Sequence, residues 1–408
     1  MKILVLNAGS SSQKSCLYEF PGGLVDQPPE PLWKGAIDWT VEPGKAAIKV
    51  KANGKVLEEL VSSTSKAEVT TQLLQTLWQG ETQVLKAPSE INVVGHRVVH
   101  GGTEYRESVR ITQEVKAAIA RLANFAPIHN PVNLEGIETI EQILGTEVPQ
   151  VAVFDTAFHA HLPPDVYVYP GPYNWLEAGI RRYGFHGTSH KYCSERAAQL
   201  LKRDLPDLRL ITCHLGNGCS LAAIRNGYSV DTTMGFTPLD GLMMGSRSGS
   251  LDPGILIYLM RNQGYTADEL DTMLNKESGL KGISGVGADM RQILAEIEKG
   301  NDRAKLAFDM YIHHLKSAIG SMLADLDRLD AIVFTAGVGE NVPLVRELAC
   351  QTFDFLGVKI DLEKNNSRPI DVDIATSDST VKVLVIHTQE EWAIAQDCWQ
   401  LVGDGSTR

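Results

Sequence analysis

The chain has 408 residues, more than one hydrophobic core usually supports, so we expect two domains with a cleft between them. Apolar residues make up 43% and charged residues 22%, and no apolar run approaches the roughly 20 residues that a membrane-spanning helix needs. The net charge of -12 argues against a nucleic-acid surface, which needs a basic face. From the charge we therefore expect no nucleic-acid partner, and from the short apolar runs we expect no membrane protein.

The N-terminal residues MKILVLNAGSSSQK indicate a strand followed by a polar turn rather than a signal peptide, because they lack a long apolar core and a cleavage site. The cysteines form no C-x-x-C pair and several lie in apolar runs, which favours reduced core thiols over disulfides. Both features favour a cytoplasmic location. The cysteines are Cys16, Cys193, Cys213, Cys219, Cys350 and Cys398.

The first half of the chain is predicted to mix strands, tight turns and helices. Asn53-Gly54, flanked by alternating residues, predicts a hairpin over residues 46–60 with a type I′ turn. Apolar spacing and turn residues give the other elements. These are strands at 2–6, 13–20, 92–100 and 150–155, a Gly/Ser turn at 7–12, and helices at 66–79, 112–123 and 133–144.

The second half repeats the opening pattern of strand, Gly turn, strand and hairpin, the hairpin turning at Asn226-Gly227. This indicates a weak internal duplication with a boundary near residue 150, although repeated α/β architecture can arise without one. The remaining elements follow from periodicity. These are strands at 208–215, 330–337 and 381–386, the hairpin at 220–232, and helices at 187–202, 252–262, 266–276, 288–298, 302–327, 342–356 and 390–402.

Glycine turns follow three apolar strands, at residues 7–12, 214–220 and 335–341. Glycine lets successive backbone N–H groups approach an anion closely and form a phosphate-binding nest. Any one such turn is more often ordinary hairpin chemistry, but three of them near basic residues favour a nucleotide. A Walker A loop and the Rossmann glycine fingerprint are both absent from the sequence.

The segment GHRVVHGG places Arg97 and Val99 on one face of an expected strand, where a guanidinium can hold a carboxylate while an apolar neighbour limits its tail. His96 and His100 share the opposite face. A zinc pair is one interpretation, but no third ligand stands at a telling spacing, so hydrogen-bonded structural histidines are favoured.

Cations cluster in two further segments, RRYGFHGTSHKY with His186, and a glycine-rich loop with Arg247. Each arginine alone is more often a surface ion-pair partner, yet cations beside glycine turns are what a transferring phosphoryl group needs. Asp155 ends a buried strand, where a carboxylate is costly unless it caps a helix, pairs with an arginine or has a function.

Two acidic segments have a structural and a functional interpretation. Thr388 and Glu391 match a helix capping box, which leaves Glu390 to ligate a cation or its waters. Asp289 and Arg291, which follow the glycines of GISGVGADMR, fit a helix cap better than a nucleotide contact on local grounds.

Nine motifs together closely resemble the acetate kinase family, over residues 3 to about 400. They are NAGSSSQK, GHRVVHGG, APIHNP, FDTAFH, RRYGFHGTSH, HLGNGCS, MGFTPLDGLMMGSRSG, FTAGVGEN and TQEEWAIA. The resemblance implies an α/β fold of two duplicated domains of the acetate and sugar kinase, Hsp70 and actin (ribonuclease H-like) type, with an interdomain cleft. It implies residues 1–153 with 392–408 as the acid and metal side, and residues 154–391 as the nucleotide-binding domain.

The resemblance also implies roles for individual residues. Asn7 and Glu390 would help to hold Mg2+, with Mn2+ as an alternative ion, and Arg97, Asp155, His186 and Arg247 would be catalytic. Arg97 would hold the acid, in a pocket closed by Val99, Ile128, Phe185 and Pro238. The nucleotide-binding residues would be Lys14, His214, Leu215, Gly216, Asn217, Gly218, Asp289, Met290, Arg291, Gly337, Val338, Gly339, Glu340 and Asn341. The sequence departs from the usual family pattern at Gln13, Met290, His387, Ser246 and Ser250.

The implied reaction is the direct, reversible in-line transfer of the γ-phosphoryl group from ATP to acetate, giving ADP and acetyl phosphate. The resemblance also implies a homodimer. An ionised carboxylate is already a nucleophile, so Asp155 is assigned an orienting role, although the family description often makes it an acid or base. A branched Val99 favours acetate over propionate only modestly, and a propionate or other short-chain acyl kinase is the alternative. An esterase and a non-catalytic nucleotide-binding protein of the Hsp70 kind are the other classes considered.

Overall fold

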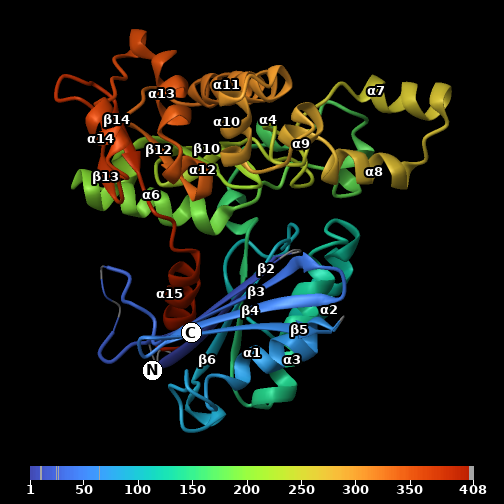
Figure 1. Ribbon diagram of the computed structural model, residues 1–408, viewed down its shortest axis with the longest axis vertical. Coiled ribbons are helices and arrows are strands. Elements are labelled where there is room, and N and C mark those ends of the chain that lie inside the picture. Colours follow the sequence, from blue (N-terminus) through green and yellow to red (C-terminus); the bar gives the residue numbers. More distant parts are fainter. Residues whose placement is uncertain (10–11, 24, 26, 64, 404–408) are drawn as a thin grey trace. The chain divides into compact units, whose positions relative to one another are not determined.

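The computed structural model describes residues 1–9, 12–23, 25, 27–63 and 65–403, so two residues of the expected turn at 7–12 lie outside the described residues. The chain forms two compact units, Met1–Ala157 with Gln389–Arg408, and Phe158–Thr388 (Figure 1). Asp155 and Glu390 therefore both belong to the first unit rather than to residues 154–391. The reason is local: Asp155 continues a strand of the first sheet, and Glu390 opens a helix packed on that sheet.

The first unit is built on one sheet with strand order β5-β4-β3-β2-β1-β6-β8-β7. β1 runs parallel to β6, and β6 parallel to β8, whereas β1 to β5 form an antiparallel meander. Its strands are β1 (Lys2–Ala8), β2 (Ser12–Glu19), β3 (Trp33–Glu42), β4 (Lys45–Ala52), β5 (Lys55–Ser62), β6 (Val93–Val98), β7 (Val109–Arg110) and β8 (Gln150–Phe154). Its helices are α1 (Lys66–Gln75), α2 (Gln113–Arg121), α3 (Asn130–Leu144) and α15 (Glu390–Val402).

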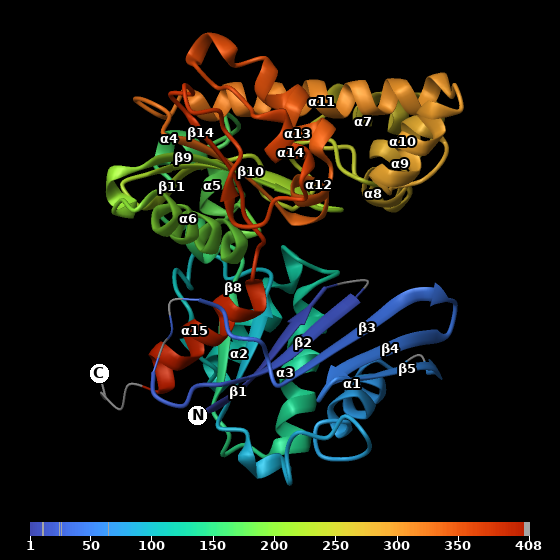
Figure 2. The same cartoon turned by 60° about the vertical axis from the view of Figure 1, so that its left-hand side comes forward.

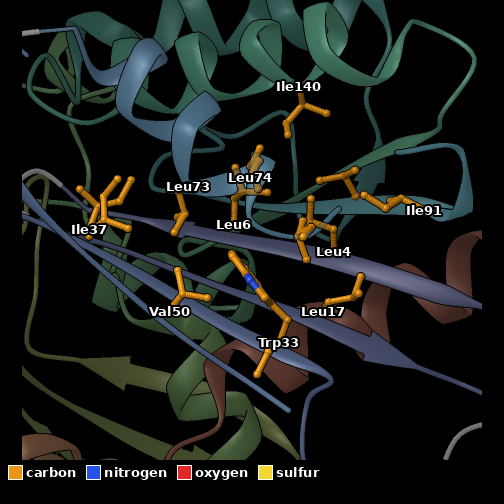
Figure 3. Packing of buried hydrophobic residues seen from close by; sticks show 14 of the residues in the cluster. Leu4, Leu6, Leu17, Trp33, Ile37, Val50, Leu73, Leu74, Ile91 and Ile140 are labelled. Carbon is orange, nitrogen blue, oxygen red and sulfur yellow. The ribbon is translucent and has the colours of Figure 1, made fainter. Parts of the chain in front are cut away.

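Helices cover both faces of this sheet, and β1 shows how the sequence assigns them. Leu4 and Leu6 join a buried cluster with Leu73 of α1 and Ile140 of α3 (Figure 3). The intervening Val5 pairs with Gly95 of β6, which lies against Ile394 and Cys398 of α15. Because side chains alternate along a strand, a continuous apolar run fills two cores at once.

The second unit is built on a sheet with strand order β11-β10-β9-β12-β14-β13. Its strands are β9 (Arg209–Leu215), β10 (Cys219–Arg225), β11 (Tyr228–Thr232), β12 (Ala331–Thr335), β13 (Val372–Asp373) and β14 (Lys382–Val385). Its helices are α4 (Pro164–Tyr167), α5 (Asn174–Glu177), α6 (Gly187–Leu201), α7 (Pro253–Tyr258), α8 (Ala267–Lys276), α9 (Gly279–Ser284), α10 (Met290–Glu298), α11 (Asp302–Leu323), α12 (Ala336–Asn341), α13 (Pro343–Gln351) and α14 (Leu362–Asn366) (Figure 2).

The two sheets share a strand order, which confirms the expected fold of two similar α/β halves. In β3-β2-β1-β6-β8-β7 and in β11-β10-β9-β12-β14-β13, three antiparallel strands are followed by two parallel strands and an antiparallel edge strand. The hairpins turn at Asn53-Gly54 and Asn226-Gly227, all four residues having positive φ as a type I′ turn requires. No described helix combines the length and the apolar character that a bilayer crossing demands.

Several local expectations differ from the structure. The expected glycine turn at 335–341 contains helix α12, which starts at Ala336 in a left-handed conformation of φ 65°. The expected helix at 252–262 is α-helical only to Tyr258 and continues as a π-helix to Gln263. The strand expected at 92–100 ends at Val98. Strand β3, whose charged and apolar residues alternate weakly, was not predicted.

Candidate active site

Three polar residues converge at the carboxyl ends of adjacent parallel strands in the first unit. Asn7 lies near the end of β1, Arg97 near the end of β6, and Asp155 directly after β8. Because the carboxyl ends of parallel strands meet at one edge, residues that are far apart in the sequence become neighbours. The Arg97 Nη1 atom lies 3.5 Å from Asn7 Oδ1, and the Arg97 Nε atom lies 3.0 Å from each Asp155 carboxylate oxygen.

Asp155 is 2% exposed, and its carboxylate is held by Arg97 in a two-pronged ion pair. Burial raises the pKa of Asp155, although the Arg97 charge and hydrogen bonds oppose that effect and the Glu390 carboxylate adds to it. The same carboxylate holds the pKa of Arg97 above its ordinary value despite burial. The pairing accounts for a carboxylate at the end of a buried strand.

The amide of Asn7 links this pair to the start of α15. Asn7 Nδ2 donates to Glu390 Oε2 and to Glu391 Oε1, each at 3.0 Å. The capping box expected from Thr388 and Glu391 is wrong: the N-cap is Gln389, which makes no side-chain capping bond, and Thr388 Oγ1 is hydrogen-bonded to Ser189. Glu391 therefore joins Glu390 beside Asn7 instead of closing the helix terminus.

Of the other residues expected to contact the acid, two belong to each unit. Val99 is buried after the end of β6, with its N–H donated to Asn133 Oδ1, and Ile128 is exposed in the first unit. Phe185 is buried in the second unit, whereas Pro238 is partly exposed there. The backbone oxygen of Pro238 accepts a hydrogen bond from Arg247 Nη1 at 3.3 Å.

In the second unit, His186 and Arg247 flank the glycine turn that follows β9. His186 is the N-cap of α6 with a left-handed φ of 56°. A methyl group placed on Gly218 would lie 3.4 Å from the His186 ring and 3.5 Å from the Arg247 guanidinium, so both side chains face that glycine. The turn itself is closed by a hydrogen bond from Gly216 N–H to Gly218 O at 3.0 Å. The chain thus presents two basic side chains over a turn with little side-chain bulk.

A large pocket of about 1070 Å3 in the second unit adjoins this turn. Of the expected nucleotide-binding residues, it is lined by Gly216, Asn217, Asp289, Met290, Arg291, Gly337, Val338, Glu340 and Asn341. His214, Leu215, Gly218 and Gly339 belong to the same segments but not to its lining. Lys14 is exposed on β2 of the first unit, opposite Asn7 in the β1–β2 ladder.

Two expected nucleotide-binding residues also have structural partners. Asp289 caps α10 by accepting the Arg291 N–H, and its carboxylate pairs with the Arg291 guanidinium. Glu340 accepts the Ala336 N–H at 2.8 Å and contacts His387 Nδ1 at 2.6 Å. Burial raises the pKa of Glu340, but these hydrogen bonds and His387 hold it below its ordinary value overall.

The pocket has further lining residues that the motifs did not reveal, including Arg346, Arg368 and Ile370. Arg346 is buried, and it holds α12 through hydrogen bonds to Gly339 O and Glu340 O at 2.8 and 2.9 Å. No sequence signal marks these residues, because single arginines and isoleucines in helices and loops are ordinary. Only the packing of α13 and the segment after α14 against α12 brings them to the pocket.

The other titratable groups are explained by burial. His96 contacts Gln150 Oε1 at 2.6 Å and His100 accepts the Gly102 N–H, and burial lowers the pKa of each histidine to about 4. All six cysteines are buried, as expected for core residues. Across the described residues, no group of three or more His, Cys, Asp or Glu side chains is arranged to hold a metal ion.

Residues 2–396 match the model of the Acetokinase family. The chain is 66% identical over 407 residues to an acetate kinase of Cyanothece sp., covering 100% of both chains. It is 63% identical to the acetate kinase of Gloeobacter violaceus, covering 98% of this chain and 99% of that protein.

Solved structures give the same relationship. The crystal structure of Porphyromonas gingivalis acetate kinase matches with a TM-score of 0.89 and 41% identity, covering 98% of this chain and 99% of that one. A propionate kinase from Francisella tularensis matches with a TM-score of 0.89 and 39% identity, covering 98% and 100%. The two neighbours resemble this chain almost equally, so similarity of fold does not distinguish acetate from propionate as the acid.

Proposed function

Because the chain belongs to the acetokinase family, we propose that it transfers the γ-phosphoryl group of ATP to acetate, giving acetyl phosphate and ADP, and that the reaction is reversible. The observation that carries this proposal is the full-length identity of 66% to an acetate kinase. The residues described above then divide into those that hold the acid, those that stabilise the phosphoryl group and those that bind the nucleotide.

Arg97 would hold the carboxylate of the acid. Its Nε and Nη2 atoms already face Asp155, so the acid would bind at Nη1, whose contact with Asn7 Oδ1 is long at 3.5 Å. Asp155 would fix the guanidinium in this orientation rather than transfer a proton, because acetate is already ionised at neutral pH. Val99, Ile128, Phe185 and Pro238 would surround the methyl group of acetate.

His186 and Arg247 would stabilise the phosphoryl group as it passes from nucleotide to acid. Phosphoryl transfer proceeds through a transition state whose charge is spread over the equatorial oxygens, so catalysis consists mainly of positioning and charge neutralisation. The two side chains face Gly218 from different segments of the second unit, which supports this role.

The residues beside Asn7 fit a magnesium ion. Mg2+ prefers oxygen ligands and is usually held by one or two protein carboxylates together with substrate phosphates and water. Asn7 Oδ1 and a carboxylate oxygen of Glu390 are such donors, and the nearby Glu391 and Asp155 carboxylates favour a cation. When bound, Mg2+ (or Mn2+) would neutralise charge on the nucleotide phosphates.

The nucleotide would occupy the pocket of about 1070 Å3, a volume at the upper end of what small-molecule sites usually have. The glycine turn at Gly216 and the start of α12 near Gly337 would contact the phosphates, and Lys14 would approach the phosphates from the first unit. Met290 and Val338 would contact the base, which stacks on apolar side chains. The first unit would be the acid and metal side, and the second the nucleotide side.

Hydroxylamine trapping of the acyl phosphate tests the activity. Purified protein would be incubated with MgATP and, in separate reactions, acetate, propionate, butyrate or no acid. We expect hydroxamate formation that depends on acetate, is lost with EDTA and weakens with longer acids, because a methylene that does not fit is worth about 1 to 3 kcal/mol. Greater activity with propionate would make this chain a propionate kinase, like its Francisella neighbour by name. No product with any acid would contradict the proposal.

We further propose that the enzyme is a cytoplasmic homodimer. The segment Leu251–Met260 supports the dimer, because Leu251, Ile255, Ile257, Tyr258 and Met260 expose between 43% and 56% of their surface. Exposed apolar residues that are contiguous mark an interaction surface more often than a solvated one. The burial of all six cysteines within the two cores supports a reducing compartment.

A further inference from the structure

A buried chain of hydrogen bonds ends at His186 in the second unit. The His186 Nδ1 atom lies 2.8 Å from Ser220 Oγ, which lies 2.8 Å from His190 Nε2. On the other side of that ring, His190 Nδ1 lies 2.7 Å from Thr212 Oγ1. Ser220, His190 and Thr212 are each 0% exposed. The proposed phosphoryl-binding histidine is therefore connected to polar groups that water does not reach.

The fold explains why these residues meet. The antiparallel ladder of β9 and β10 pairs His214 with Ser220 and Thr212 with Ala222, so Ser220 and Thr212 project from the same face of the sheet. Helix α6 packs on that face, and His190 lies four residues after His186 on it, one turn further along. One helical turn thus spans the distance between the site and the buried strand residues.

His190 allows the direction of the hydrogen bonds to be assigned. Burial lowers its pKa well below the ordinary value, so the ring is neutral and has one N–H and one lone pair. Thr212 has a single hydroxyl proton and two possible acceptors, His190 Nδ1 at 2.7 Å and Ala222 O at 3.5 Å. The shorter contact is the stronger bond, since 3.5 Å is beyond the usual range.

The other bonds follow from that assignment. Thr212 donates to His190 Nδ1, so the His190 proton is on Nε2 and is donated to Ser220 Oγ. Ser220 then donates its own proton to His186 Nδ1. In this arrangement His186 Nδ1 is an acceptor, and a neutral His186 ring must have its proton on Nε2.

We propose that Thr212, His190 and Ser220 are positioning residues that fix the tautomer of His186, with the proton on Nε2. This inference rests on the proposed function, in which His186 faces the transferring phosphoryl group. An N–H directed at a phosphoryl oxygen stabilises its charge, whereas the opposite tautomer presents a lone pair and repels it. No proton is transferred along this line of hydrogen bonds, whose role is to orient the His186 ring.

The His214 ring supports the same orientation. It stacks on the His186 ring at a centroid distance of 4.2 Å and an interplanar angle of 25°. Its own Nδ1 atom is held by Ser189 Oγ at 2.8 Å. The stack fixes the plane of the His186 ring, and the hydrogen bond from Ser220 fixes which nitrogen has the proton.

The kinetic test compares Ser220→Ala with Ser194→Ala. Ser194 is also fully buried and lies on α6, but its hydroxyl donates to the His190 backbone oxygen. It therefore takes no part in the line of side-chain hydrogen bonds from Thr212 to His186. We expect Ser220→Ala to lower kcat about 10- to 100-fold, as removing an orienting partner typically does, with KM for acetate and ATP within about twofold. Ser194→Ala should keep a kcat near that of the unmodified enzyme. If Ser220→Ala does not fold, as judged by thermal unfolding, Thr212→Val makes the same comparison.

The tautomer is measured directly by long-range 1H–15N NMR on protein labelled at histidine, with His186→Asn to assign the signal. We expect a protonated Nε2 in the unmodified enzyme and a mixture of tautomers in the Ser220→Ala variant. A protonated Nδ1 with unprotonated Nε2, or a Ser220→Ala variant with unchanged kcat, would overturn the inference. An unmodified enzyme that forms no acyl phosphate would instead contradict the proposed function.

Discussion

Asp155 is a buried acidic residue whose proposed role is to hold an arginine in place rather than to transfer a proton. Its carboxylate holds the Nε and Nη2 atoms, which form one edge of the Arg97 guanidinium, and burial raises its pKa while Arg97 opposes that effect. A buried ion pair of this kind is costly to break, because the remaining partner keeps an uncompensated charge. The orientation of Arg97, and therefore acid binding, should depend on Asp155.

The Asp155→Asn variant tests this role. We expect KM for acetate to rise about 10-fold or more and kcat to fall as well, because the guanidinium loses its charged anchor. KM for ATP should change little. Steady-state kinetics with each substrate varied in turn gives the three values. A loss confined to kcat, with KM for acetate unchanged, would favour a proton-transfer role instead.

Arg247 is expected to act in the transition state. Arg247→Ala should lower kcat about 100-fold or more while KM for acetate and ATP changes little, because charge develops on the phosphoryl group only during transfer. Arg328→Ala is the control, since Arg328 is exposed in the same unit and pairs with Asp330. Both variants are measured with the hydroxamate assay. Retention of kcat in Arg247→Ala would remove Arg247 from the proposed mechanism.

Asp231 lies near Arg182 and should make stability depend on pH. Burial raises its pKa to about 6, against about 3.9 in an unfolded chain. The folded state therefore binds the proton more tightly, and stability falls as pH rises from about 4 through about 6. Asp231→Asn removes this dependence. As pH rises from 4 to 7.5, the free energy of unfolding of the variant, measured relative to that of the unmodified protein, should therefore increase by on the order of 2 kcal/mol.

Urea unfolding of both proteins across that pH range measures the difference. Asp378→Asn is the control, because Lys359 lowers the pKa of Asp378 to about 2 and the sign is opposite. That group stabilises the fold above the unfolded pKa, and the contribution is lost as pH falls through the folded value. Parallel stability curves for Asp231→Asn and the unmodified protein would contradict the assignment.

At the scale of elements, the segment after α14 forms a rim of the proposed nucleotide pocket, and its backbone is strained. Arg368 and Asp371 have φ values of 57° and 50°, which side chains with a Cβ rarely adopt. Asp371 anchors the segment by accepting hydrogen bonds from Arg196 and from the His387 N–H. Ile370, between these residues, is 70% exposed and lines the pocket. Strain held in place by such anchors often marks a binding segment.

Ile370→Ala should therefore weaken nucleotide binding. Loss of apolar contact with the base is expected to raise KM for ATP roughly threefold to tenfold, with kcat and KM for acetate unchanged. Val372→Ala is the matched control, because Val372 is also exposed but does not line the pocket. Calorimetric titration with MgADP gives the affinity without turnover. Equal affinities for the two variants would exclude Ile370 from the binding surface.

At the scale of the whole molecule, each unit has its own sheet, covered by helices on both faces. Asn7, Arg97 and Asp155 belong to the first unit, and His186 and Arg247 belong to the second. The exposed apolar segment Leu251–Met260 belongs to the second unit and is the surface assigned to the dimer.

Ile257→Asp tests the dimer. A charge in an apolar interface costs several kcal/mol when it is desolvated, so the variant should shift toward the mass of one chain. Val56→Asp is the control, because Val56 is exposed on β5 of the first unit. Light scattering coupled to size exclusion gives the mass. An unchanged mass for Ile257→Asp, or a monomeric unmodified protein, would contradict the assigned interface.

The sequence by itself determined the local elements and the repeated plan of the two halves. Apolar periodicity and the Asn-Gly turns depend on neighbouring residues, so both hairpins and most helices could be predicted to within a few residues. The motifs were sufficient for the family. Helix ends such as Tyr258 and the missed strand β3 depend on packing partners, which the local pattern does not contain.

Which polar residues lie together depends on how the strands and helices pack. Three sets of contacts join residues on different elements. They are the Arg97–Asp155 pair, the contact of Asn7 with Glu391, and the line of hydrogen bonds from Thr212 through His190 to His186. Glu391 shows the difference most clearly, since the capping motif is a local pattern and the long-range hydrogen bond to Asn7 replaced it. The residues of a site can be predicted from a sequence, but their contacts depend on the order of the strands within the sheet.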